Sequence, residues 1–68
     1  MNVVTDIPGK LLKCRHTGKY YKYLIQLNEI WAVLVYDETD ENQIYEEICL
    51  SHKDALYRYN HLNEGDFR

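Results

Sequence analysis

Apolar and polar side chains alternate along two neighbouring stretches, residues 10–16 and 20–27. Alternation with a period of two is typical of half-buried strands, and the short glycine-containing loop at 17–19 is of the kind that joins antiparallel strands. The pattern therefore predicts a β-hairpin. In the first stretch it groups Leu12, Cys14 and His16 on one face and Leu11, Lys13 and Arg15 on the other. In the second stretch it groups Tyr21, Tyr23, Ile25 and Leu27 on the face opposite Lys22 and Gln26.

Residues 30–36 are continuously apolar and rich in β-branched and aromatic types. They follow the tight connection at 28–29 and precede an acidic loop at 37–42. A run of this length suits a strand buried on both faces, at the centre of an antiparallel meander. Its two faces are Trp31, Val33 and Val35 on one side and Ile30, Ala32, Leu34 and Tyr36 on the other.

Residues 43–50 fit either a strand or a helix, and the next segment favours the strand because it carries its own helix-start signal. Ser51 followed by Asp54 is close to a capping box. The predicted helix runs from His52 to about Asn63, and Gly65 fits its C-terminal stop. Its apolar stripe is Ala55, Leu56, Tyr59 and Leu62.

These elements predict an α+β fold, a small antiparallel meander of three or four strands with a C-terminal helix packed on one face. An SH3-like small β-barrel is the alternative. The chain of 68 residues is expected to form a single domain, 1–68. Residues 1–9, which end in the turn signal Pro8-Gly9, are expected to form an N-terminal arm or an edge strand.

Charge is segregated along the chain. Residues 10–22 carry five bases and no acid, residues 23–50 carry seven acids and no base, and the net charge is −3. Two interpretations are open: attraction between adjacent strands of opposite charge, or a bipolar surface that steers a charged partner. The isoelectric point near 5.5 argues against a binder of duplex nucleic acid.

Recognisable catalytic and phosphate-loop motifs are missing from the sequence, so no enzyme activity and no cofactor are expected. Cys14, His16, Cys49 and His52 form a Cys₂His₂ set, but Cys-x-His is not a usual zinc spacing, and no metal is expected. The sequence has two cysteines and shows no signal peptide, so reduced thiols in a cytoplasmic protein are expected. It has no apolar run of about 18 residues, so no interaction with a membrane is expected.

The first hypothesis is a non-enzymatic interaction module, an inhibitor or adaptor that binds another protein and also self-associates. Aromatic side chains dominate binding hot spots, and acidic side chains complement a basic partner. The chain looks like the small accessory proteins of phages and mobile elements in its size, its lack of catalytic motifs and its charge segregation. This likeness assigns a role to no individual residue. The expected interface is Trp31, Tyr36, Tyr45, Tyr57, Tyr59, Asp37, Glu38, Asp40 and Glu41.

The second hypothesis is a binder of a nucleotide or of a short single strand. In the hairpin over residues 10–23, basic side chains alternate with aromatic ones, a combination that can hold phosphates and stack bases. The residues expected to contact such a ligand are Lys13, Arg15, Lys19, Tyr20 and Lys22.

Overall fold

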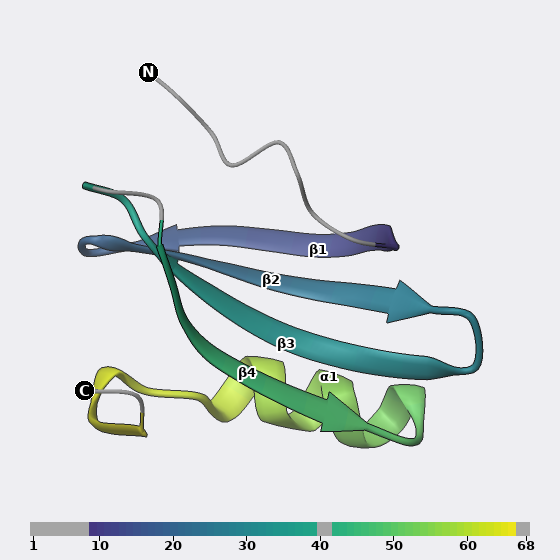
Figure 1. Cartoon of the computed structure of the whole chain (residues 1–68). Helices are drawn as coiled ribbons and strands as arrows, with labels where there is room; N and C mark the ends of the chain where they lie inside the picture. The colour runs from purple at the N-terminus through teal and green to yellow at the C-terminus, as the bar shows by residue number, and fades with distance from the viewer. Residues whose placement is uncertain (1–8, 40–41, 67–68) are drawn as a thin grey trace.

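Four antiparallel strands follow one another in a meander, and a helix covers one face of the sheet (Figure 1). The computed structural model describes residues 9–39 and 42–66, so the arm predicted for residues 1–9 lies outside them apart from Gly9. The sheet is open, with β1 and β4 as its edges, which confirms the α+β meander and removes the barrel alternative. The elements are β1 (Lys10–Thr17), β2 (Tyr20–Leu27), β3 (Ile30–Asp37), β4 (Gln43–Cys49), α1 (His52–His61) and the 3₁₀ turn η1 (Glu64–Asp66).

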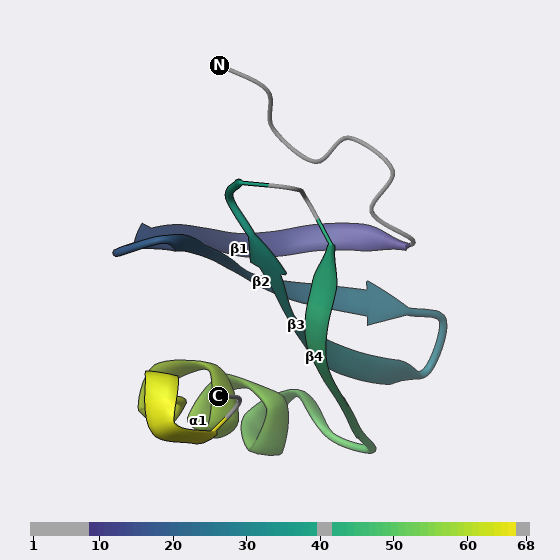
Figure 2. The same cartoon turned by 60° about the vertical axis from the view of Figure 1, so that its left-hand side comes forward.

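Two-residue turns set the register of the central hairpins. Thr17 pairs with Tyr20 across the first turn, where Gly18 has a φ of +59°. Leu27 pairs with Ile30 across the second, where Asn28 has a φ of +58°. Tight turns with positive φ match the right-handed twist of the flanking strands, and Figure 2 shows that twist continuing through β3 and β4.

A β-bulge in β1 changes which side chains share a face. Leu11 pairs with Ile25 and Lys13 pairs with Leu24, which leaves Leu12 as the extra residue. Leu12 packs into the core under the helix, whereas Cys14 and His16 pair with tyrosines of the opposite face. The predicted grouping of Leu12 with Cys14 and His16 is therefore wrong, because strict alternation assumes no inserted residue.

The helix-side core joins the sheet to α1. The N-cap Ser51 accepts a hydrogen bond from the Asp54 amide at 3.1 Å, as predicted. The helix ends at His61, with Leu62 extended, before the predicted Asn63, and Gly65 lies in η1 instead of capping the helix. The buried members of this core are Tyr20, Leu24, Val33, Val35, Cys49, Ala55, Tyr59 and Leu62.

The other face of the sheet holds a second core rich in tyrosine. The ring of Tyr23 lies 6.3 Å from that of Tyr21 and meets Tyr36 edge-on at 5.6 Å. His16 stacks on Tyr21 at 4.5 Å and bonds to Glu38 at 2.6 Å. As predicted, β3 is buried on both faces. The buried members of this second core are Tyr21, Tyr23, Ile25, Ala32, Leu34 and Tyr36.

The cap at Ser51 gives a first testable prediction. Ser51→Ala removes the acceptor of the Asp54 amide and should lower the free energy of unfolding by about 1 kcal/mol. Ser51→Asn, which retains a capping acceptor, should stay close to wild type. Urea unfolding measures both, and equal midpoints for the alanine variant and wild type would contradict the assigned cap.

Two glycines with positive φ give a second, matched prediction. Gly9 and Gly18 have φ of +72° and +59°, so alanine at either costs about 1 kcal/mol in backbone strain. A Cβ at Gly9 would also meet the Gln26 carbonyl and lie 2.6 Å from Leu27 Cδ2, whereas Gly18 has nothing within 4 Å. Gly9→Ala should therefore destabilise the protein more than Gly18→Ala, and equal losses in urea unfolding would contradict the packing of Gly9.

Candidate functional site

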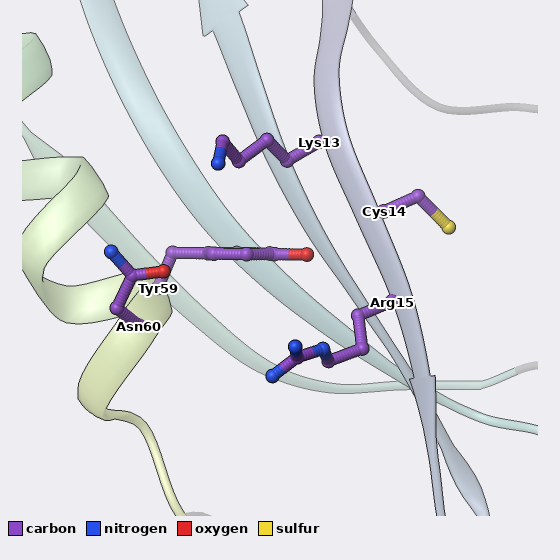
Figure 3. Close-up of a pocket in the computed structure, with 5 residues that line it drawn as sticks. All are labelled: Lys13, Cys14, Arg15, Tyr59 and Asn60. Carbon is purple, nitrogen blue, oxygen red and sulfur yellow. The ribbon is translucent and has the colours of Figure 1, made fainter.

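A pocket of about 310 Å³ lies between β1 and α1. It is lined by Lys13, Cys14, Arg15, Tyr59 and Asn60. Figure 3 shows Lys13 and Arg15 reaching from β1 toward α1 on either side of the Tyr59 ring, while the side chain of Cys14 points away. The bulge at Leu12 makes this possible, because it leaves Lys13 and Arg15 on the helix side of the sheet.

A third cation, Lys22, stands next to this pocket. Lys22 lies directly opposite Arg15 in the register of β1 and β2, and its ammonium is 4.8 Å from the centre of the Tyr59 ring. Burial, and then the charge of Arg15, lower the pKa of Lys22. The ring offsets part of this cost through a cation–π contact. We call Lys13, Arg15, Lys22, Tyr59 and Asn60 the basic pocket.

Lys13, Arg15 and Lys22 of the basic pocket take part in none of the ion pairs among the described residues. The ion pairs found there join His16 to Glu38 and Arg58 to Glu47. Arg15 has Lys22 opposite it, so pairing of basic and acidic neighbours across strands does not occur at this position. The basic pocket is therefore a local cluster of positive charge on a chain whose net charge is −3.

Three of the five residues predicted to bind a phosphate-bearing ligand come together: Lys13, Arg15 and Lys22. Lys19 lies in the β1–β2 turn, where its carbonyl accepts the Glu38 amide at 2.9 Å, and Tyr20 is buried in the helix-side core. Sequence reasoning missed Tyr59 and Asn60 as pocket residues. The predicted apolar stripe of the helix places Tyr59 against the sheet. The sequence does not determine which strands α1 packs beside, and so it does not predict that Tyr59 lies next to β1.

The residues predicted as an interface are spread over core and surface. Tyr36 and Tyr59 are buried, at 8% and 5% exposure, and so contribute to the two cores. Trp31 is half-buried and stacks on His52 at 5.9 Å. Tyr57 is 63% exposed. Of the others, Tyr45 is half-buried on β4. Asp37 ends β3, Glu38 follows it in the β3–β4 loop, and Asp40 and Glu41 are outside the described residues.

A second surface lies where the β4 edge meets the start of α1. Ile48, Leu50 and Tyr57 are 47%, 81% and 63% exposed. All three line one pocket of about 400 Å³, together with Glu47, Cys49, Asp54 and Arg58. We call Ile48, Leu50 and Tyr57 the β4 patch. Alternation in residues 43–50 already groups Ile48 with Leu50, but it does not show that this side stays exposed.

The Cys₂His₂ set is divided between the two edges and the two faces of the sheet. Cys14 and His16 lie on β1 and pair with residues of the tyrosine-rich face. Cys49 is buried on the helix side of β4, and His52 begins α1. Both cysteines are free thiols, and within residues 9–39 and 42–66 no three metal-ligating side chains gather. These four residues therefore do not form a common site.

Comparison of the chain with protein-family models, with curated proteins and with solved structures gives no match. The described part of the chain contains no helix long and apolar enough to cross a membrane. The geometry of the two surfaces is therefore what bears on function.

Tyr45, beside the β4 patch, gives a prediction on pH. Burial, and then its hydrogen bond to Glu47, raise the pKa of Tyr45 from 10.0 to about 12. A raised phenol pKa favours the neutral form in the folded state, so this contribution to stability is complete below pH 10 and is lost as pH rises toward 12. Tyr45→Phe should make the free energy of unfolding fall less steeply over that window.

Chemical unfolding at several pH values measures this slope. Burial also raises the pKa values of Tyr36 and Tyr59, so part of the slope should remain in the Tyr45 variant. Tyr57→Phe, on the exposed side of α1, is the control and should leave the curve unchanged. Identical slopes for Tyr45→Phe and wild type would contradict the role of Tyr45.

Proposed function

We propose that this protein is a small non-enzymatic interaction module that binds another protein through the β4 patch. The observation that carries the proposal is the position of three exposed apolar side chains beside an open strand edge. Edge strands are usually protected by charges, bulges or a covering element. An exposed apolar patch next to an open edge is typical of an interaction site.

The β4 edge supports a particular mode of binding. Along one side of an edge strand the backbone N–H and C=O groups lack a partner strand, so an extended segment can add as a fifth strand. Ile48, Leu50 and Tyr57 then offer apolar contacts to alternate side chains of that segment. The proposed role is that of an inhibitor or adaptor, which acts by occupying a segment of its partner.

Charge around the β4 patch indicates the chemistry of that partner. Exposed Glu46 lies on the strand, and Asp54 and Glu47 line the adjoining pocket. Glu47 is already paired with Arg58 at 3.0 Å, which leaves Glu46 and Asp54 to favour a segment with basic side chains. Free thiols at Cys14 and Cys49 agree with the cytoplasm as the proposed compartment.

A matched pair of variants tests the proposal. Leu50→Lys and Ile48→Lys add a charge to the β4 patch, while Leu11→Lys does the same on β1, where Leu11 is 47% exposed, as is Ile48. A partner captured from host cells by wild type should be retained by Leu11→Lys. The β4 variants should bind it at least about thirtyfold more weakly, as expected for a hot spot.

Hydrogen exchange of the complex adds a second readout. Binding by strand addition should slow exchange at the β4 amides that point away from β3, and leave β1 unchanged. If Leu50→Lys, folded by circular dichroism, retains full affinity, or if Leu11→Lys loses as much, the β4 patch is not the binding surface. Light scattering identifies a second copy as the partner if wild type is a dimer and Leu50→Lys is a monomer.

A further inference from the structure

The basic pocket lies at the other edge of the sheet and shares no residue with the β4 patch. We propose that it binds the phosphate group of a small phosphorylated ligand, held by Lys13, Arg15 and Lys22 from the sheet and by Tyr59 and Asn60 from α1. This site is independent of the proposed protein interaction, so the failure of one leaves the other standing.

Like charges gathered on one face are the first argument. Arg15 and Lys22 are direct cross-strand partners, whose Cβ atoms in such a pair lie about 5 Å apart. Lys13 precedes Arg15 by two residues, so strand geometry places it on the same face. Like charges directly opposite each other destabilise a sheet. A bound dianion would attract each of these cations and so offset the repulsion between them.

The hydrogen-bond donors are the second argument. The guanidinium of Arg15 presents a fork that matches two phosphate oxygens, and Lys13 adds an ammonium. Both point into the pocket beside the hydroxyl of Tyr59 and the amide of Asn60 (Figure 3). Donors from two elements thus surround a space of about 310 Å³, which suits a compact group with several oxygens.

The remaining charge distribution favours a small ligand over a nucleic-acid strand. Lys10 begins β1 and Lys19 lies in the β1–β2 turn, and neither lines the pocket. The chain carries a net charge of −3. Proteins that follow a nucleic-acid backbone present a basic surface over several nucleotides. A single cluster of cations on an acidic protein fits one phosphate or diphosphate group.

A titration of the full chain followed by two-dimensional NMR tests the proposal. The probes are inorganic phosphate, pyrophosphate, ADP, adenosine and a short oligothymidylate. Pyrophosphate and ADP should bind saturably, shift the resonances of residues 13–15, 22 and 59–60, and weaken with added salt; adenosine should not bind. Equal affinity for pyrophosphate and ADP means that the phosphates alone are recognised, and tighter ADP binding means that the nucleoside adds contacts.

Matched variants separate a built site from general charge attraction. Arg15→Gln and Lys13→Gln should weaken pyrophosphate binding at least tenfold. Lys53→Gln, which removes the same charge from an exposed position of α1, should bind as wild type. Without ligand, Arg15→Gln should melt no lower than wild type, because it removes a repulsive pair; a residue with a merely structural role would lower the melting temperature when replaced.

Three outcomes would overturn the proposal. The first is the absence of saturable pyrophosphate binding at millimolar concentration. The second is equal weakening by Lys53→Gln, which would indicate unspecific attraction. The third is oligothymidylate binding much tighter than pyrophosphate, which would assign the surface to single-stranded nucleic acid instead.

Discussion

The burial of β3 on both faces is the constraint on which the rest of the structure depends. Val33 and Val35 contact the helix-side core, while Ala32 and Leu34 contact the tyrosine-rich core, and all four are at most 1% exposed. A short chain buries a smaller fraction of its surface than a large domain does. A strand buried on both faces therefore adds more to the core than a strand buried on one face. This forces β3 to the inside of the sheet and leaves β1 and β4 as open edges.

Meander topology then turns charge order along the chain into charge position in space. Because the strand order is β1-β2-β3-β4, the basic residues 10–22 fall on the edge strand β1 and on the start of its neighbour β2. The acidic residues of β4 fall on the other edge. The two edges therefore differ in chemistry: β1 contributes cations to a pocket under α1, whereas β4 contributes exposed apolar side chains with acidic neighbours. Both proposals follow from this separation.

Much of the fold could be predicted because it depends on local patterns. The continuous apolar run at 30–36, the two tight turns and the cap at Ser51 are each encoded by neighbouring residues. The bulge at Leu12 could not be predicted, since a hydrophobic residue fits either face and the insertion depends on pairing with β2. Residue type alone predicts an interface role for Tyr59, whereas in the structure its ring lies under the Lys22 ammonium. Asn60 enters the pocket only through the docking of α1, a tertiary contact without a local signal.

The central claim is that the β4 edge is open and available for binding. Native-state hydrogen exchange of the protein alone tests this claim most directly. Exchange in the β3 amides should be slow, because both neighbouring strands hold them in hydrogen bonds, and the β4 amides that point away from β3 should exchange fast. That contrast is the result expected here. Exchange of the outward β4 amides as slow as in β3, in a protein shown to be monomeric, would mean that the edge is already covered and would contradict the account.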